Sequence, residues 1–283
     1  MQPRIFEVGP RDGLQNEKVH IPLDVKEQYV QLLVLSGLKD IEAGAFVSPK
    51  AVPQMADSKE LLPKLIEEFP NVNFHSLVPN LKGLEVALDC GVSHFGLLTS
   101  CSDEFNKRNL KTDINGSISR IKEILSQSPE DSFHRIYLSM TFHSPWEGKI
   151  SNEVFEETLE KFKDLEFDEL VLSDTTGHAT PDMVKEKIDL ACKFFSVKKL
   201  ACHFHDTKNM AVENIKAALM MGIGTFDSST GGLGGCPYSP GATGNIATRD
   251  VLKAFTEQGA VIDLDEKRLN EAAEFIKNYI ASH

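Results

Sequence analysis

The chain has 283 residues, of which 41% are hydrophobic and only one is tryptophan, as is typical of a globular protein with a sizeable core. Its formal net charge of -12 argues against nucleic acid or an anionic membrane as a partner, because both require a basic surface. Because the chain is acidic overall, an anionic ligand must be bound by a local basic patch. No apolar run approaches the roughly 20 residues that span a bilayer.

The cysteines and the first residues bear on the cellular compartment. The five cysteines form an odd set without C-x-x-C pairs, which favours a reducing cytosol over a disulfide framework or a structural zinc site. They are Cys90, Cys101, Cys192, Cys202 and Cys236. Residues 1–10 enter an apolar run at once, so we expect neither a signal peptide nor a transit peptide. The sequence predicts a cytoplasmic protein, with a processed organellar form as the alternative.

Short apolar runs alternate with amphipathic runs along the whole chain, and no low-complexity linker interrupts them. The apolar runs predict eight strands, at residues 4–9, 40–46, 72–78, 94–100, 135–142, 169–176, 200–206 and 225–230. The amphipathic runs predict helices at residues 23–37, 57–69, 81–91, 114–128, 152–167, 181–195 and 210–222. Several of these helices end in glycine, a common helix terminator.

This unbroken β-α order predicts a parallel sheet, and eight repeats of roughly 30 to 35 residues match an α/β fold of the (β/α)8 TIM-barrel type. The alternative is a doubly wound open sheet, which usually carries G-x-G-x-x-G after its first strand, where this chain has GPRDGLQN. We expect residues 1–283 to form one domain with the barrel at about 3–258. Helical material at 246–259 supplies the eighth barrel helix, and about 263–283 forms a C-terminal helical extension.

Unusual polar residues lie at the carboxyl ends of the predicted strands, where TIM barrels carry their active sites. We expect these side chains to converge on one mouth of the barrel, with His143 at the end of the fifth strand. They are Arg11, Asp12, Glu42, His143, Asp174, His203 and His205.

The pair His203 and His205 is the sharpest local signal. Strand alternation places both imidazoles on one face and Cys202 on the other. A lone histidine would more often be a hydrogen-bonded core residue, but two at this spacing, in a chain that also offers Asp12 and Asn245, favour a metal site. Such a mixed N/O site indicates Mg2+ or Mn2+, with Zn2+ and Co2+ as alternatives, and Lewis-acid chemistry on an alcohol.

Arg11 and two carboxylates complete the candidate mouth. Arg11 beside Asp12 could form only a surface ion pair, but inside a mouth its guanidinium would hold a developing oxyanion. Glu42 lies in an apolar strand, where an unpaired carboxylate is costly, so we expect Arg11 as its partner. Glu42 and Asp174 could equally be ordinary salt-bridge partners.

Residues 231–245, GGLGGCPYSPGATGN, carry six glycines around one cysteine. They fit no P-loop, because GxxxxGK[ST] is absent, and no G-x-G-x-x-G, because Pro237 breaks it. The following segment is too short to be a domain, which argues against a linker. We expect a mobile loop over the mouth, with Gly231 to Gly235 as its hinge and Cys236 at its tip; an inert cysteine is the alternative.

Taken together, these residues resemble the hydroxymethylglutaryl-CoA lyase family, within the metallolyase superfamily of TIM barrels. The matching segments run from residue 7 to about 248 and include EVGPRDGLQNEK, IEAGAFVSPKAVPQM, HFHDT and GGLGGCPYSPGATGNIAT. Arg-Asp after the first strand with Glu on the second marks the superfamily, whereas GGLGGCPY is more specific to the lyases.

The resemblance implies cleavage of 3-hydroxy-3-methylglutaryl-CoA to acetyl-CoA and acetoacetate, with Mg2+ or Mn2+. It implies that the metal ligands are Asp12, His203, His205 and Asn245. Arg11 would hold the thioester enolate oxygen and Cys236 would be the loop thiol. His203 would also take part in proton transfer, supported by Asp174 and Glu42.

The expected partner is an acyl-CoA thioester, together with a homodimer as the expected assembly and no nucleic acid or membrane. Arg11 and Gln15 are expected to bind substrate at the mouth. Lys107 and Arg108, in the run FNKRNLK after the fourth strand, could meet CoA phosphates, although a solvated charge run is the alternative.

Several positions depart from the family's usual pattern and leave the acyl group open. Ala45 stands where Ser is common, Lys208 and Asn209 replace Tyr-Gly, and Arg249 replaces Glu. The segment MTFHSPWEG lacks the family's usual cysteines. The alternatives are therefore a lyase for a related 3-hydroxyacyl-CoA, a Claisen-type synthase, and a barrel that has lost catalysis and serves as a binding module.

Overall fold

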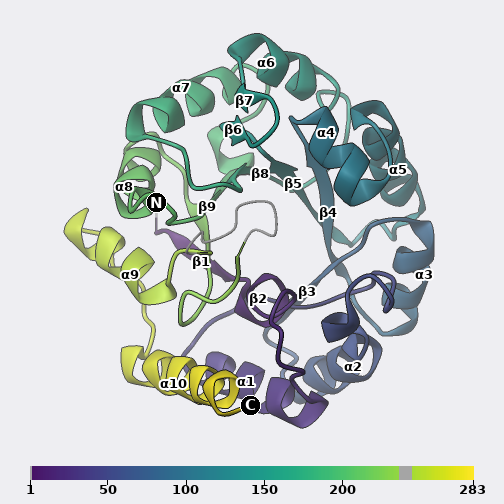
Figure 1. Cartoon of the computed structure of the whole chain (residues 1–283), viewed down its shortest axis with the longest axis vertical. Coiled ribbons are helices and arrows are strands. Elements are labelled where there is room, and N and C mark those ends of the chain that lie inside the picture. The colour runs from purple at the N-terminus through teal and green to yellow at the C-terminus, as the bar shows by residue number, and fades with distance from the viewer. Residues whose placement is uncertain (1, 236–243) are drawn as a thin grey trace.

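The computed structural model describes residues 2–235 and 244–283, and within them eight parallel strands close into a barrel surrounded by helices (Figure 1). The hydrogen-bonded order around the barrel is β1, β10, β9, β8, β5, β4, β3, β2. The barrel strands are β1 (Arg4–Glu7), β2 (Asp40–Ala45), β3 (Asn73–Leu77), β4 (His94–Ser100), β5 (Phe133–Ser139), β8 (Glu169–Asp174), β9 (Leu200–Phe204) and β10 (Thr225–Ser228). The predicted (β/α)8 barrel is confirmed.

The helices follow the predicted amphipathic segments and cover the outside of the barrel (Figure 1). They are α1 (Leu23–Leu35), α2 (Ser58–Glu68), α3 (Leu81–Asp89), α4 (Asp103–Phe105), α5 (Ile114–Gln127), α6 (Asn152–Glu160), α7 (Pro181–Ala191), α8 (Ala211–Met220), α9 (Thr248–Glu257) and α10 (Glu266–Ser282). Four short helical turns are η1 (Gly9–Gly13), η2 (Pro53–Met55), η3 (Asn106–Leu110) and η4 (Val197–Lys199). The last helix, α10, lies beside α1.

Local chemistry sets the helix ends. Asn80 and Asp113 accept backbone N–H bonds from Gly83 and Gly116 and so begin α3 and α5. Thr180 caps α7 directly before a proline at its first position. Beyond α8, Gly222 has a φ of +90°, a conformation that glycine adopts without strain, as the glycine pattern predicts.

Several predicted boundaries were wrong, and α7 ends at Ala191 rather than at Phe195. The fifth strand ends at Ser139, because Met140 adopts a φ of +52° and turns the chain out of the sheet. His143 therefore lies in β6 (His143–Ser144), which pairs with β7 (Gly148–Lys149) in a small hairpin outside the barrel. Helix α6 ends at Glu160 rather than near residue 167, and the chain continues in turns.

The barrel interior is polar below the mouth. Arg135 on β5 is fully buried; its Nε donates to Glu169 at 2.8 Å and its Nη2 to Asp227 at 2.5 Å. Its guanidinium also lies 3.7 Å from the ring centroid of Phe6. A buried cation with two carboxylates and an aromatic face has its charge well compensated, so these strands can meet around it.

Candidate active site

Three ligand-type side chains converge at the mouth. Asp12 follows β1, and His203 and His205 lie at the end of β9; one ligand atom from each lies within 4.8 Å of the others. Both histidines are buried and their ring centroids are 5.1 Å apart. The strand alternation that predicted this pair is therefore confirmed.

Asn245 joins this cluster from the segment after β10. It pairs with His205 in an isolated antiparallel bridge, and its Nδ2 donates to Asp12 Oδ2 at 2.8 Å and to the Leu233 carbonyl at 3.1 Å. Its Oδ1 is buried and has no hydrogen-bond partner among the described residues. Nδ1 of His205 is likewise buried and has no hydrogen-bond partner among them. Buried polar atoms without partners are rare, so this arrangement fits a bound cation.

The electrostatics favour the forms that bind a metal. Burial opposes the ionisation of Asp12, but Arg11 and the two histidines lower its pKa to about 2. Burial and the neighbouring His203 lower the pKa of His205 to about 3. At neutral pH the cluster therefore presents a carboxylate and a neutral imidazole, which are the states required for coordination.

The orientation of His203 is fixed by a residue that the sequence analysis missed. Its Nδ1 lies 3.0 Å from Oδ2 of Asp227 on β10. A carboxylate can only accept, so Nδ1 carries the proton and Nε2 keeps a free lone pair. Burial alone would raise the pKa of Asp227, but Arg135 and His203 hold it below its usual value. The available signal was a charged residue within an otherwise buried strand.

Arg11 is locked by carboxylates on two sides. Its Nε donates to Glu42 in a short bond, and its Nη1 donates to Asp12 Oδ1 at 2.8 Å. The expected partnership of Glu42 with Arg11 is confirmed. Tyr137, also missed from the sequence, donates to the other Glu42 oxygen at 3.2 Å. Nη2 of Arg11 has no hydrogen-bond partner among the described residues, so it is free to donate to a ligand.

Asp174 ends β8 and organises the loop that follows. Its two oxygens accept the backbone N–H groups of His178 and Ala179, both at 2.9 Å. Burial raises its pKa to about 6, although these backbone hydrogen bonds oppose the change. The Asp174 side chain therefore binds its own loop. It does not belong to the cluster of Asp12, His203 and His205, whose ligand atoms lie within 4.8 Å of one another.

The predicted substrate-binding residues divide into two groups. Gln15 lies with Arg11 at the mouth, where its Nε2 donates to Asp12 Oδ1 at 3.0 Å. Lys107 and Arg108 are exposed in η3, and each pairs with a carboxylate of the preceding α4, Asp103 at 2.7 Å and Glu104 at 2.5 Å. Their charges are thus partly neutralised before any ligand binds.

The glycine-rich segment is described as far as Gly235, and Cys236 lies outside the described residues. Gly234 has a φ of +102°, and a Cβ atom there would lie 2.7 Å from Asn245 Nδ2 and 3.1 Å from the Asp12 carbonyl. This glycine is thus required for close packing against two of the candidate ligands.

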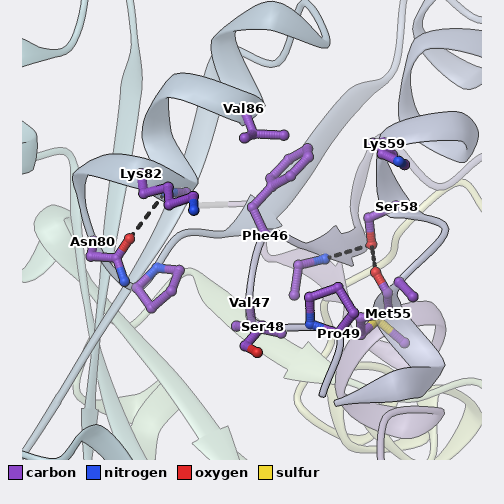
Figure 2. Close-up of a pocket in the computed structure, with 14 residues that line it drawn as sticks. Phe46, Val47, Ser48, Pro49, Met55, Ser58, Lys59, Asn80, Lys82 and Val86 are labelled. Atoms are coloured by element: carbon purple, nitrogen blue, oxygen red, sulfur yellow. Dashed lines mark hydrogen bonds between the residues drawn. The ribbon is translucent and has the colours of Figure 1, made fainter. Parts of the chain in front are cut away.

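A pocket of about 360 Å³ opens at the end of β2, between α2 and α3, and none of the candidate metal ligands lines it (Figure 2). Its walls are largely apolar, with Phe46, Met55 and Val86, and Lys59 and Lys82 lie at its edge. Both lysines line the pocket and bring positive charge to it. The pocket is thus suited to a ligand with an apolar part and an anionic part.

The comparisons agree with this geometry. The family model described as HMGL-like matches residues 2–276. The chain is 41% identical over 276 residues to the mitochondrial hydroxymethylglutaryl-CoA lyase of Bos taurus, covering 97% of this chain and 85% of the relative. It is 38% identical over 274 residues to the cytoplasmic 3-hydroxy-3-methylglutaryl-CoA lyase of Rattus norvegicus, covering 96% and 80%.

Solved structures match over the same length. The HMG-CoA lyase of Brucella melitensis superposes with a TM-score of 0.94 at 36% identity, covering 99% of both chains. An HMG-CoA lyase of Acinetobacter baumannii in complex with coenzyme A and 3-methylmalate superposes with a TM-score of 0.93 at 34% identity, covering 99% of this chain and 92% of that one. Within the described residues, no helix is both long and apolar enough to cross a membrane.

Proposed function

The chain belongs to the HMGL-like family, and on that premise we propose that it cleaves 3-hydroxy-3-methylglutaryl-CoA to acetyl-CoA and acetoacetate. The observation that carries the proposal is the convergence of Asp12, His203 and His205 beside the unpaired Nη2 of Arg11. A metal-binding cluster next to a free guanidinium nitrogen suits a reaction that first deprotonates an alcohol and then forms an oxyanion.

The family acts with divalent cations, and we propose that Asp12, His203, His205 and Asn245 hold one here. Mg2+ and Mn2+ suit the carboxylate and amide oxygens of this set, whereas Zn2+ and Co2+ are alternatives that imidazole also binds. When bound, the ion would make the substrate hydroxyl more acidic and orient its oxygens.

The remaining steps use the chain's own groups. Loss of the hydroxyl proton lets the bond between C2 and C3 break, so that the hydroxyl carbon becomes the ketone of acetoacetate and the electron pair passes to the thioester enolate. We assign the developing negative charge on the enolate oxygen to Arg11, whose Glu42 and Asp12 contacts fix its orientation. Protonation of the enolate carbon then gives acetyl-CoA.

Proton transfer is assigned to His203 and Cys236, with Asp174 and Glu42 in support. The role of His203 draws on its buried hydrogen bond to Asp227, which fixes the ring. The role of Cys236 rests on its place in the glycine-rich segment of the sequence. The supporting roles are positional, since Glu42 holds Arg11 and Asp174 holds the loop between β8 and α7.

The CoA part of the substrate has two candidate binding regions. Lys107 and Arg108 are exposed but already paired, whereas Lys59 and Lys82 lie at the edge of an apolar pocket. We propose that Lys107 and Arg108 bind the CoA phosphates, and we expect the pocket in Figure 2 to contribute to CoA binding.

The one-domain organisation, the homodimer and the cytoplasmic location also stay proposals. The rat relative named cytoplasmic supports the cytoplasmic location, whereas the bovine relative is named mitochondrial.

Acetoacetate formation tests the proposal. The purified protein, loaded with Mg2+ or Mn2+, is incubated with 3-hydroxy-3-methylglutaryl-CoA and acetoacetate is measured over time. We expect turnover by the wild type, loss of metal binding and turnover in His203→Ala, and loss of turnover with metal retained in Cys236→Ala.

The matched control for the thiol is Cys192→Ala, because Cys192 is an exposed free cysteine just after α7. It should keep full turnover. Turnover of another 3-hydroxyacyl-CoA without acetoacetate formation would contradict the substrate while keeping the lyase class. Joining of an acyl-CoA to an oxo acid would favour a synthase, and the absence of any metal binding would favour a barrel without catalysis.

A further inference from the structure

Glu7, the last residue of β1, is a fully buried carboxylate outside the cluster of candidate metal ligands. Its Oε1 accepts the backbone N–H of Gly9 at 2.9 Å and that of Thr230 at 2.7 Å. Its Oε2 accepts the hydroxyl groups of Thr230 and Thr248, both at 2.7 Å. Burial raises the pKa of Glu7, and these four hydrogen bonds oppose the change. All four donors are neutral groups that replace the hydration of a buried carboxyl group, so the segments that supply them are held against it.

The donors come from η1 and from both ends of the glycine-rich segment. Gly9 is the first residue of η1, the turn that carries Asp12. Thr230 directly precedes the glycine-rich segment. Thr248 is the first residue of α9 and lies three positions after Asn245, the last residue of that segment. A single carboxyl group therefore joins the two ends of the glycine-rich segment to the turn that carries a candidate metal ligand.

Close packing fixes the carboxyl group from the side of α1. The hydroxyl of Tyr29, a buried residue of α1, donates to the carbonyl of Thr230 at 3.2 Å. A Cβ atom at Gly9 would lie 2.5 Å from Oε1 of Glu7 and 2.5 Å from the Tyr29 hydroxyl. The turn can thus approach the carboxyl group this closely only because residue 9 is glycine.

The candidate metal site spans the two segments that Glu7 joins. Asp12 belongs to η1, whereas Asn245 lies at the end of the glycine-rich segment, and Nδ2 of Asn245 donates to Oδ2 of Asp12 at 2.8 Å. The backbone N–H groups of Ile246 and Thr248 donate to the carbonyls of Phe204 and Ser229 at 3.2 and 3.3 Å. These backbone bonds keep the stretch folded, so loss of the Thr248 hydroxyl bond should shift Asn245 without unfolding its surroundings.

Resting on the proposed function, we infer that Glu7 is a positioning residue that sets the spacing between Asp12 and Asn245 through the hydroxyl of Thr248. The oxygens of these two side chains must reach the same cation, and a site of this kind needs its ligands held to within about 0.5 Å. Glu7 supplies this constraint from beneath the mouth, because it binds the backbone of η1 with one oxygen and the first residue of α9 with the other.

Replacement of Thr248 tests the connection and leaves the carboxyl group in place. Valine has the shape of threonine without the hydroxyl, whereas serine keeps the hydroxyl. Titration calorimetry with Mn2+ and no substrate should give a Kd about fivefold or more above the wild type for Thr248→Val, and within about twofold for Thr248→Ser. The matched control is Thr158→Val, because this buried hydroxyl donates to the Val154 carbonyl within α6. It should lose stability and keep its Mn2+ affinity.

Variants of Glu7 itself test the role of its oxygens. Glutamine keeps an oxygen for the two backbone N–H groups, and its amide can donate to both threonine hydroxyls, so Glu7→Gln should stay within about threefold of the wild-type Mn2+ Kd. Glu7→Met offers no strong acceptor and should raise that Kd by about fivefold or more. The threonine variants carry the test where Glu7→Met does not fold, because they keep the carboxyl group and its backbone bonds.

A double variant distinguishes positioning from a general loss of structure. In Asn245→Ala the side chain through which Glu7 acts is gone, so adding Thr248→Val should raise the Mn2+ Kd by less than about twofold more. Losses that add in full would mean that the Thr248 bond acts elsewhere, and this would overturn the inference. Spin resonance of bound Mn2+ gives a second readout, since its spectrum should change in Thr248→Val and not in Thr158→Val.

The remaining outcomes separate this inference from the proposed reaction. An unchanged Mn2+ Kd in Thr248→Val, or an equal loss in Thr248→Ser or Thr158→Val, overturns the positioning role even in a protein that forms acetoacetate. Absence of Mn2+ binding by the wild type overturns both the positioning role and the metal site. The expected order of Mn2+ affinities in a protein that forms no acetoacetate would sustain the positioning role and contradict the reaction.

Discussion

Replacing Asp227 with asparagine tests whether the buried carboxylate sets the tautomer of His203. In the wild type, Oδ1 accepts from Arg135 at 2.5 Å and Oδ2 accepts from His203 at 3.0 Å. Asparagine keeps one acceptor and replaces the other with an amide NH2. The charge-assisted bond to Arg135 is the stronger of the two and should retain the acceptor. The NH2 group then faces Nδ1 of His203, which must accept, so the proton moves to Nε2 and blocks the lone pair that would bind a metal.

To bind a metal, Asp227→Asn would have to return the proton of His203 from Nε2 to Nδ1. Loss of such an outer hydrogen bond typically costs 10-fold to 100-fold in metal affinity, or about 1.4 to 2.8 kcal/mol. We therefore expect the Kd of Asp227→Asn for Mn2+, measured by titration calorimetry, to rise by about that factor. Spin resonance of bound Mn2+ gives an independent readout, because coupling to the His203 nitrogen should weaken.

The matched control is Asp40→Asn, at the opposite end of the barrel. Asp40 is likewise buried and contacts an arginine and a histidine, Arg4 at 3.3 Å and His75 at 3.3 Å, but neither of these belongs to the metal cluster. It should lose stability and keep its Mn2+ affinity. Equal Mn2+ affinity in wild type and Asp227→Asn, or an equal loss in both variants, would refute the tautomer argument.

Two further predictions concern packing and pH. Gly234→Ala should weaken Mn2+ binding, because its Cβ would lie 2.7 Å from Asn245 Nδ2 in a backbone with a φ of +102°. Gly235→Ala is the control, because nothing lies within 4 Å of a Cβ atom at that position. Equal Mn2+ affinities of the two variants would contradict the packing argument. Burial lowers the pKa of His75 to about 4, although Asp40 opposes the change. Between about pH 6.5 and pH 4 the unfolded chain therefore binds more protons than the folded protein does. The free energy of unfolding should decline by up to about 3 kcal/mol as the pH falls through that window. Chemical denaturation at several pH values should show a shallower decline for His75→Phe; an unchanged slope would show that other groups cause it.

Much of the fold could be predicted from local patterns. All eight barrel strands follow from apolar runs between amphipathic segments, because each βα unit must bury its strand on both faces. The error at the fifth strand has a local cause that sequence does not display, since Met140 takes a left-handed conformation and donates its N–H to Thr175 at 2.9 Å. The β6–β7 hairpin that follows was missed for the same reason.

The part of the candidate site that consists of polar residues at strand ends could be predicted from the sequence. The buried residues that hold them from inside the barrel could be predicted less well. The predicted pairing of Glu42 with Arg11 followed from the cost of a buried carboxylate. Asp227 and Tyr137 were missed because their partners are 24 and 95 residues away, and no local pattern encodes such contacts.

The buried groups form one hydrogen-bonded path from Arg11 to His203, through Glu42, Tyr137, Arg135 and Asp227. Tyr137 is its central member, since its hydroxyl donates to Glu42 at 3.2 Å and accepts from Arg135 at 3.1 Å. Tyr137→Phe keeps the ring but leaves one buried oxygen and one buried N–H unpaired, which should cost about 1 to 3 kcal/mol of unfolding free energy.

The variant should separate the two ends of that path. Asp227 and its bond to His203 are untouched in Tyr137→Phe, so Mn2+ affinity should stay within about twofold of the wild type, whereas turnover should fall because Glu42 holds Arg11 less firmly. Combination with Asp227→Asn should then give additive losses in Mn2+ affinity. A marked loss of Mn2+ affinity in Tyr137→Phe alone would instead mean that the path acts as a single unit, in which the oxyanion site and the metal site cannot be altered independently.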